Sequence, residues 1–328
     1  MLNPGLSMLW ETVDAEQALR ERFGLAGRAA ATRLLTALLA EHWGISVQAL
    51  PRLTLSDHNA IAWVGSDHGP LVVKLSSAQD RFTQLAASTR LLTELTARGI
   101  PVPAPLPSRS GSVRLEVDGP AGPLSLAVLP EVPGDWLDVS DLHAVHAAGA
   151  CLAALHGALG DITVEGLSHQ YPRPQPDRIS GWLCDRDPGP LPAASDRLAE
   201  LLTGLPAPED SPQLIHGDFR AANLLVRDSG IAAVLDFDEV RLDHRIADLA
   251  QAGTYLATRF RGWGPTPLPA RAALRAGYES VRPLDPLGSR WFETLTLWMG
   301  IAAIPSQDDG RWARAADALS GAQPGPRG

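Results

Sequence analysis

Short apolar runs separated by turn sequences fill the chain between residues 49 and 130. The runs are rich in Val, Leu and Ile and have the length of β-strands, while "SDHN" and "GSDHG" between them are typical of turns. The prolines of "RGIPVPAPLP" cannot continue a helix and end the one helical pattern in this region. The predicted elements are strands at 49–55, 60–64 and 70–76, a helix at 80–98, and strands at 112–117 and 124–130.

Helical patterns dominate the rest of the chain. The segment 141–159 has an apolar stripe, with Ser140 or Asp141 as its N-cap, and we expect His156 to be packed inside the core. "PEVPGDW" is a Pro/Gly-rich crossing and the expected hinge. Further helices are predicted at 15–43, 243–260, 269–280 and 287–301, whereas 161–212 is Pro-rich and predicted to be irregular, and the tail "GAQPGPRG" frayed.

This order of elements predicts an α+β fold with two lobes and a cleft between them. The small lobe is antiparallel and β-rich, and the large lobe is mainly helical. The expected division is an N-terminal helical segment at 1–48, the β-rich lobe at 49–130 and the helical lobe at 131–328.

Composition narrows the possible partners. The chain has 328 residues, of which 45% are hydrophobic, and a formal net charge of −9, which disfavours nucleic acid or an anionic membrane as partner. Two cysteines are too few for a disulfide framework, so a reducing cytoplasm is the expected compartment. We expect no signal peptide and no apolar run near the roughly 20 residues that span a bilayer. The sequence does not indicate an oligomeric state.

The segment "LIHGDFRAANLLVRDSGIAAVLDFDEVRLDH" places acidic and amide side chains among strongly apolar residues. Two apolar runs flank Ser229-Gly230, which predicts a two-residue hairpin turn. In that register Asn223 lies directly opposite Asp236, with Cβ atoms roughly 4.5–5.5 Å apart. A buried carboxylate is costly unless it is paired or metal-bound, and oxygen ligands suit Mg²⁺. The hairpin therefore predicts a magnesium site.

Two further residues complete the requirements of phosphoryl transfer. Asp218 precedes Asn223 by five residues, on the loop that enters the hairpin, where it can orient an attacking hydroxyl. Lys74 in "LVVKLS" is a cation inside an apolar strand and can bind phosphates. Taken alone, Lys74 also fits an edge-strand lysine whose amine reaches solvent.

The spacing of Asp218, Asn223 and Asp236, with the wording "HGDFRAANLLV…VLDFD", resembles the aminoglycoside phosphotransferase/choline kinase family, which has a protein-kinase-like fold. "RPLDPLGSRWFETLTLWMGIAAIP" resembles the homoserine-kinase-like branch. The resemblance implies an ATP- and Mg²⁺-dependent kinase that phosphorylates a hydroxyl of a small molecule, such as an aminoglycoside, an amino alcohol or homoserine.

The resemblance also implies roles for individual residues. Asp218 would be the catalytic base, Asn223 and Asp236 the Mg²⁺ ligands, and Asp248 a structural aspartate. "SDHNAI", the nucleotide loop, has no glycine, and Ser88 stands where the family's helix carries a glutamate partner for the lysine; Glu94 lies six residues later. The cofactor-binding residues would be Lys74, Ser56 and Asn59 at the phosphates and Leu129, Glu131 and Val132 at the adenine.

Several alternatives remain open on the sequence alone. Asp238, Glu239 and Asp243 form either a solvated loop or an acidic wall for a cationic acceptor. Ser56 and Asn59 are turn formers as well as phosphate-loop residues, and His216 is expected to be structural. A nucleotide-binding regulator that has lost catalysis and a metal-dependent phosphoesterase are the rival functions. The intact set of Asp218, Asn223 and Asp236 argues against the regulator, and Lys74 together with the hinge argues against the phosphoesterase.

Overall fold

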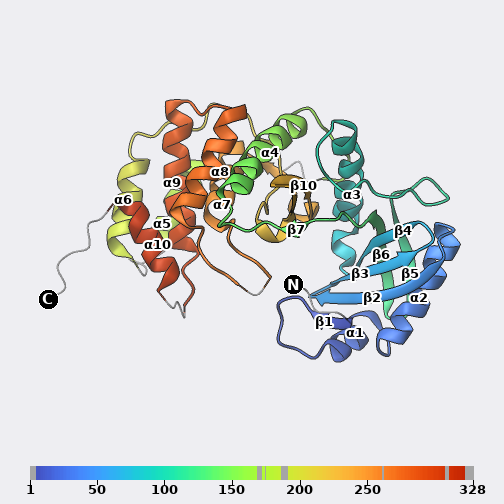
Figure 1. Ribbon diagram of the computed structural model, residues 1–328. Helices are drawn as coiled ribbons and strands as arrows, with labels where there is room; N and C mark the ends of the chain where they lie inside the picture. Colours follow the sequence, from blue (N-terminus) through green and yellow to red (C-terminus); the bar gives the residue numbers. More distant parts are fainter. Residues whose placement is uncertain are drawn as a thin grey trace. The chain divides into compact units, whose positions relative to one another are not determined.

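The computed structural model describes residues 5–167, 172–173, 175–185, 191–260, 262–306 and 310–321. The chain divides into two compact units. Unit 1 comprises Met1–Pro133 and Thr163–Leu167, and unit 2 comprises Gly134–Ile162 and Ser168–Gly328. Figure 1 shows the strands of unit 1 in blue to green and the helices of unit 2 in green to red.

Unit 1 is built on a six-stranded sheet in the order β1-β2-β3-β4-β6-β5. The three predicted strands, the helix and the hairpin are all present, and one further strand pairs in parallel with β2 at the edge of the sheet. The strands are β1 (Gly5–Met8), β2 (Val47–Ser56), β3 (Asn59–Ser66), β4 (Gly69–Ser76), β5 (Arg114–Gly119) and β6 (Gly122–Pro130), and the helices are α1 (Ala15–Phe23), α2 (Arg28–His42), η1 (Gln79–Arg81) and α3 (Phe82–Ala97).

The expected helix over 15–43 is interrupted. Gly24 ends α1 with φ +69°, a left-handed conformation that glycine adopts without strain, and α2 starts four residues later. Both helices pack on one face of the sheet, where Leu71 and Val73 of β4 join the hydrophobic core. Because side chains alternate along a strand, the intervening residues of β4, including Lys74, belong to the other face.

Unit 2 contains the remaining elements. The segment 161–212, expected to be irregular, holds two helices among its described residues; one of them starts at Pro192, a position where proline fits the first helical turn. The elements are β7 (Asp135–Trp136), α4 (Leu142–Gly160), α5 (Gln175–Asp185), α6 (Pro192–Leu202), β8 (Gln213–Ile215), η2 (Ala221–Asn223), β9 (Leu224–Arg227), β10 (Gly230–Val234), η3 (Phe237–Glu239), β11 (Arg241–Asp243), α7 (Arg245–Tyr255), α8 (Leu268–Val281), α9 (Pro286–Ala302) and α10 (Arg311–Ser320). The tail beyond residue 321 lies outside the described residues.

Helix α4 is the core helix of unit 2. Asp141 caps it by accepting from the N–H groups of the first turn. A Cβ on Gly149 would lie 2.8 Å from the backbone nitrogen of Tyr278, so α4 and α8 approach backbone to backbone. In the described part of the chain α4 alone is long and apolar enough to cross a membrane by length and composition. The expectation that no apolar run comes near the length of a membrane span was therefore wrong. The close packing against α8 identifies α4 as a core helix.

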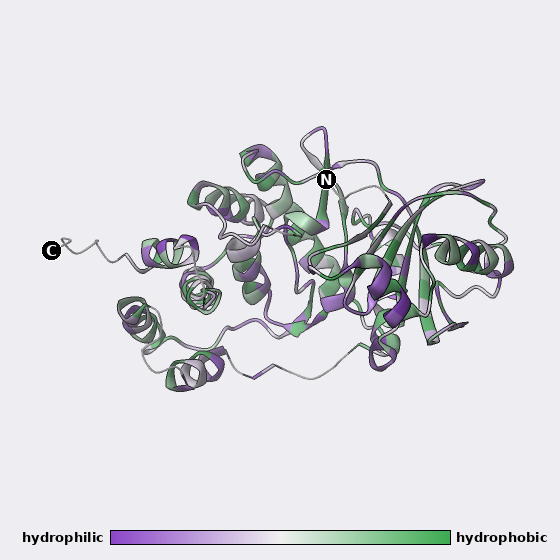
Figure 2. Ribbon diagram, turned by 90° about the horizontal axis from the view of Figure 1, so that it is seen from below, coloured by the Kyte–Doolittle hydropathy of each residue, from purple (hydrophilic) through white to green (hydrophobic). Residues whose placement is uncertain are grey.

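The same division of apolar and polar residues runs through both units. In Figure 2 hydrophobic residues are green and hydrophilic ones purple, and single helices carry both colours. Such amphipathic helices bury one side against a sheet or another helix and expose the other to water. The polar residues of interest are those that depart from this rule and lie buried in unit 2.

Candidate active site

A buried aspartate fixes the loop that follows β8. Asp248, in the first turn of α7, is fully buried; its Oδ2 accepts the N–H of His216 at 2.9 Å and its Oδ1 the N–H of Gly217 at 3.0 Å. Nε2 of His156 lies 3.0 Å from Oδ2, and Nδ1 of His156 lies 2.9 Å from the Tyr278 hydroxyl. The core position expected for His156 is confirmed. Three segments that are distant in sequence thus hold the start of the loop.

The pKa of Asp248 reflects these contacts. Burial by itself raises the pKa of a carboxyl group, because it penalises the charged form. The hydrogen bond and charge of His156, the charge of His216 and the Gly217 N–H outweigh burial and lower the pKa of Asp248 below its ordinary value. Asp248 therefore stays ionised at neutral pH and acts as a multiple acceptor.

His216 orders the next part of the loop. Its Nδ1 accepts the N–H of Asp218 at 3.1 Å, which leaves Nε2 to donate to the carbonyl of Leu235 at 3.0 Å. Gly217 has φ +79°, and a Cβ there would lie 2.5 Å from the carbonyl oxygen of Glu239, so no other residue fits. The structural role expected for His216 is confirmed, since both ring nitrogens serve the backbone.

Asp218 is the centre of a polar cluster. Nε of Arg220 lies 2.8 Å from Oδ1 and 2.9 Å from Oδ2 of Asp218, and Nδ2 of Asn223 donates to Oδ2 and to the backbone oxygen of Asp218, both at 2.8 Å. The N–H of Ala221 donates to the carbonyl of Leu256 and anchors η2 to the end of α7. The five-residue spacing of Asp218 and Asn223 thus closes a small loop on itself.

The electrostatics of this cluster favour a proton acceptor. Burial raises the pKa of Asp218, the nearby charge of Asp236 raises it further, and the charge and hydrogen bond of Arg220 and the charge of His216 act in the opposite direction. The net effect is a pKa above the ordinary carboxyl value. A carboxylate whose pKa is shifted toward neutrality is a better general base at physiological pH.

The hairpin turn lies one residue earlier than predicted. Asp228 and Ser229 have φ +52° and +58°, the two positive values that a type I′ turn requires, and Gly230 already belongs to β10, where it pairs with Arg227. The register of the β9–β10 pair then shifts between Ile231 and Ala233, so that β10 carries one extra residue. The predicted Ser229-Gly230 turn was therefore wrong.

The predicted pairing of Asn223 with Asp236 is corrected accordingly. The N–H of Leu235 donates to the carbonyl of Asn223 at 2.8 Å, so Leu235 is the residue opposite Asn223. Asp236 follows directly, with φ +63°, an uncommon conformation for a residue with a side chain. It still belongs to the cluster, because its charge acts on the pKa of Asp218.

The donor set of this cluster fits a magnesium ion bound jointly with phosphates. The NH₂ group of Asn223 is committed to Asp218, so the amide oxygen is its remaining acceptor, and Asp236 is an exposed carboxylate. Within the described residues no group of three or more His, Cys, Asp or Glu side chains could hold a metal by itself. Mg²⁺ commonly takes one or two protein oxygens and fills its octahedron with phosphate oxygens and water.

In unit 1, Lys74 lies in the middle of the sheet. It pairs with Ile61 of β3 and Ala127 of β6, and its side chain is half-buried on the face that α1 and α2 do not cover. The central position explains why an edge-strand role does not apply: β4 has a neighbour on each side.

Helix α3 lacks an acidic residue at the expected position. Ser88 is buried there, and its hydroxyl donates to the carbonyl of Leu85 at 3.1 Å. Glu94 forms an ion pair with Arg98 at 2.8 Å on an exposed part of α3. Glu94 is thus already paired on its own helix.

The proposed nucleotide loop is a tight β2–β3 hairpin. Ser56 pairs with Asn59 across a two-residue turn, and the N–H of Asp57 in that turn donates to Oε2 of Glu11 at 3.1 Å. Arg22 holds the same carboxylate at 2.8 Å. The tip of the loop is therefore tied to the segment between β1 and α1.

The end of β6 offers two backbone groups to a ligand. Leu129 pairs with Val72 of β4, and the N–H of Glu131 donates to the carbonyl of Pro70 at 3.0 Å, which extends the sheet pairing by one residue. The carbonyl of Glu131 and the N–H of Val132 come next. A carbonyl followed by an N–H is the backbone pattern that a purine edge can pair with.

The three residues of the expected acidic wall differ in environment. Asp243 is 2% exposed; its Oδ1 accepts from Gln175 at 2.8 Å and its Oδ2 from Arg178 at 3.0 Å, so it links β11 to α5 inside unit 2. In η3, Asp238 is half-buried and Glu239 is exposed. The wall can therefore include Asp238 and Glu239, whereas Asp243 is engaged inside the unit.

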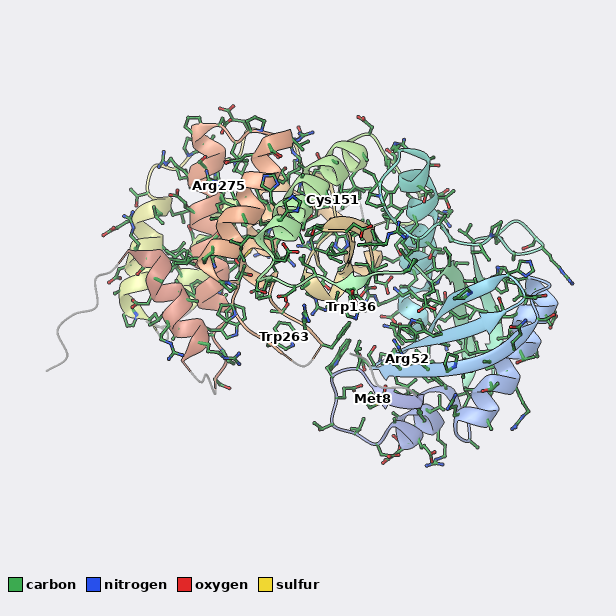
Figure 3. The ribbon with its side chains drawn as sticks, viewed as in Figure 1. Met8, Arg52, Trp136, Cys151, Trp263 and Arg275 are labelled. Carbon is green, nitrogen blue, oxygen red and sulfur yellow. The ribbon has the colours of Figure 1, made fainter. Side chains whose placement is uncertain are left out.

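Sequence reasoning passed over Arg220, the cation bound to Asp218. Its guanidinium also lies 5.9 Å from the ring centre of Trp263, a residue of the loop after α7 that is labelled in Figure 3. Phe260 of the same loop makes an edge contact with Trp136. The available signal was a cation two residues after the predicted base, and only the structure shows that the two side chains pair.

Comparison with known proteins gives a consistent result. Residues 55–284 match the description "Phosphotransferase enzyme family". A homoserine kinase of Xanthobacter autotrophicus is 33% identical over 214 residues, which are 60% of this chain and 60% of that protein. The chain spans about three fifths of the length of the curated relatives it matches first.

Two solved structures have the same fold at low identity. A microcompartment-associated aminopropanol kinase has a TM-score of 0.60 and 19% identity, with 88% of this chain and 94% of that chain covered. Aminoglycoside phosphotransferase APH(4)-Ia has a TM-score of 0.58 and 19% identity, with 89% of this chain and all of that chain covered. The predicted kinase-like α+β architecture is thus confirmed.

Proposed function

The chain belongs to the phosphotransferase enzyme family, and on that premise we propose that it is an ATP- and Mg²⁺-dependent kinase that phosphorylates a hydroxyl group of a small molecule. The observation that carries the proposal is the cluster around Asp218, a carboxylate of raised pKa held between Arg220 and Asn223. A binding module has no need of such a group. The cytoplasmic location expected from composition remains part of the proposal.

The reaction assigns a separate task to each residue of the cluster. The acceptor oxygen forms a bond to the γ-phosphorus while the bond to the bridging oxygen of the β-phosphate breaks, and ADP leaves. Asp218 orients the hydroxyl and takes its proton. Arg220 lies beside Asp218, where its charge can stabilise the charge that builds up on the transferred phosphoryl group.

Asn223 and Asp236 are the residues we assign to the metal. A Mg²⁺ ion held by these two side chains would neutralise phosphate charge. Asp236 lies two residues after the end of β10 and has φ +63°. Such conformations cost roughly 1–3 kcal/mol and recur at functional sites, where they aim a side chain.

Unit 1 supplies the residues that we assign to the rest of the nucleotide. Lys74 binds the α- and β-phosphates, as a compact cation on a rigid central strand. The carbonyl of Glu131 and the N–H of Val132 pair with the adenine edge, and Leu129 contributes the neighbouring apolar surface. Ser56 and Asn59, which flank the β2–β3 turn, are also assigned to the phosphates.

The acceptor is a small hydroxyl compound. Three of the similar proteins are named as a homoserine kinase, an aminopropanol kinase and an aminoglycoside phosphotransferase. The acceptors in these names are small hydroxyl compounds that also carry an amine. Asp238 and Glu239 can attract the amine of such a compound. This common chemistry supports an amino alcohol as the acceptor class.

A catalytically inactive nucleotide-binding regulator is the second candidate. Two observations favour it: Ser88 stands at the position on α3 where an acidic residue was expected, and the N–H of Asp57 in the nucleotide loop already donates to Glu11. Both would weaken phosphate binding in a kinase. Neither affects the Asp218 cluster, for which a regulator has no use.

The deciding experiment is ADP release from Mg-ATP with a panel of hydroxyl acceptors. The panel contains homoserine, amino alcohols, choline, aminoglycosides, macrolides and simple sugars. The kinase predicts turnover with one acceptor that drops by about 10²–10⁴-fold in Asp218→Asn and persists in the exposed control Asp196→Asn. ATP binding without turnover on any acceptor, equal in parent and Asp218→Asn, would establish the regulator instead.

A further inference from the structure

Unit 2 contains a cavity of about 460 Å³ that the proposed mechanism does not use. Its walls are the loop after α7, the first turn of α8 and the first turns of α10. The lining is unusual for its charge: three arginines contribute to it, and the described residues of the wall include no carboxylate. The lining includes Gly264, Thr266, Arg271, Arg311 and Arg314.

Arg271 carries the strongest signal. It is only 6% exposed; its Nε donates to the carbonyl of Gly253 at 2.9 Å, but its Nη1 is buried and has no hydrogen-bond partner. Burial lowers the pKa of Arg271 to about 10. A buried guanidinium N–H without an acceptor is costly, and native proteins rarely leave one. The missing acceptor is what an anionic ligand would supply.

The other walls add positive potential. Arg314 is exposed and makes no side-chain hydrogen bond or ion pair with the described residues. Arg311 also lines the cavity, with its Nη1 3.4 Å from the Cβ position of Gly264. Neither α8 nor α10 has a side-chain N-cap, and the first turns of both line the cavity. Uncapped N-terminal turns present N–H groups and a partial positive charge.

We infer that this cavity binds an anionic group, a carboxylate or a phosphate, through Arg271 and Arg314, with Arg311 completing the ring. The guanidinium fork is suited to bidentate recognition of either group. The buried Arg271 provides the fixed contact, and the exposed Arg314 is the one that can move onto the ligand.

The place of the cavity in the unit suggests where the anion comes from. Gly262 and Gly264 line it, and Trp263 between them lies over Arg220, the partner of Asp218. One wall of the cavity is therefore the back of the loop that contacts the Asp218 cluster. An acceptor with both a hydroxyl and an anionic group can use both places; this part of the inference rests on the proposed kinase function. A separate small anion is the other source.

The first experiment measures anion binding without nucleotide, so it does not depend on catalysis. Inorganic phosphate and malonate are titrated into the protein by calorimetry at low ionic strength. Saturable binding is expected, weakened about tenfold by Arg314→Gln, the loss of one charge-assisted contact, and abolished by Arg271→Met. The control Arg290→Gln, an exposed arginine on α9, should leave it unchanged. If Arg271→Met does not fold, Arg314→Gln and Arg311→Gln carry the test.

Absence of saturable binding, or binding that none of the cavity variants alters, would overturn the inference. A second arm separates the two sources by using L-homoserine and 3-amino-1-propanol, which differ only in the carboxylate. If the anion belongs to the acceptor, Arg314→Gln raises the KM for homoserine about tenfold relative to that for aminopropanol. If the anion is separate, the ratio of the two KM values stays constant and phosphate still binds. A protein that turns over no acceptor of the full panel but binds phosphate through the cavity arginines refutes the proposed activity alone.

Discussion

Replacement of Asp248 by asparagine should destabilise unit 2 strongly, although it only replaces one carboxylate oxygen by an NH₂ group. The carboxylate accepts three hydrogen bonds, from His216 N–H, Gly217 N–H and the His156 ring, within 3.0 Å. Asparagine has one carbonyl oxygen, which can replace Oδ2 and keep two of the donors. Its NH₂ group then faces the N–H of Gly217, donor against donor, in a fully buried place.

The magnitude follows from these contacts. The buried N–H that loses its acceptor costs about 1–3 kcal/mol, and the two remaining hydrogen bonds each lose roughly 1 kcal/mol when the acceptor is no longer charged. The expected loss is about 3–5 kcal/mol, which agrees with the typical cost of breaking a buried charged pair. Most single domains have only about 5–15 kcal/mol of stability to lose.

Urea unfolding followed by tryptophan fluorescence and circular dichroism measures this loss, with Asp196→Asn as an exposed control expected within about 0.5 kcal/mol of the parent. The difference should also depend on pH. The pKa of Asp248 is lowered in the folded state, so its contribution is complete above the unfolded value of about 3.9 and disappears as pH falls through the folded value. A loss under 1 kcal/mol at pH 7, or a loss that grows in acid, would refute the reasoning.

Three further outcomes are expected. The acid limb of the pH profile of kcat/KM should lie above the usual carboxyl range, because the pKa of Asp218 is raised. Arg220→Met should move this limb to higher pH, because it removes the charge that lowers the pKa of Asp218. An unmoved limb in the variant would contradict the assignment of Asp218 as the base. Gly149→Ala should lower the free energy of unfolding by several kcal/mol, because its Cβ would collide with the backbone of α8. Gly157→Ala on the same helix should be neutral or slightly stabilising, because no atom lies nearer than 3.7 Å to its Cβ position. Equal effects of the two substitutions in urea unfolding would exclude the close packing of α4 and α8. Asp236→Asn should raise the Mg²⁺ concentration needed for half-maximal turnover about tenfold or more, and an unchanged requirement would remove Asp236 from the metal site.

The secondary structure of unit 1 was predictable because its signals are local. Alternating apolar residues between Gly and Asp-rich turns predicted five of its strands, and the prolines after residue 100 marked the end of α3. The same holds for Asp141 as N-cap and for His156 as a core residue in α4. Each of these follows from the period of side chains along one element, which the order of residues contains directly.

The hairpin that carries the candidate metal ligands was predictable in kind but not in register. Asn223 and Asp236 were expected to face each other, and the structure shows Leu235 in that place. Asp228 and Ser229 adopt positive φ although a glycine stands next to them, and a bulge follows. The cost of positive φ for such residues is about 1–2 kcal/mol, which packing of the strands can outweigh.

The sequence by itself determined the main strands of unit 1, the core helix α4, the family resemblance, and Asp218, Asn223 and Asp236 as candidate site residues, because these follow from local patterns and from the spacing of residues along the chain. Only the tertiary structure decided what those residues touch. His156 reaches Asp248 across 92 residues, Arg220 neutralises Asp218, and Arg271 lies buried with an unpaired Nη1 beside two helix N-termini. Burial and pairing are set by segments that meet only after folding, so the charge environment that decides the chemistry of a side chain is absent from its local sequence.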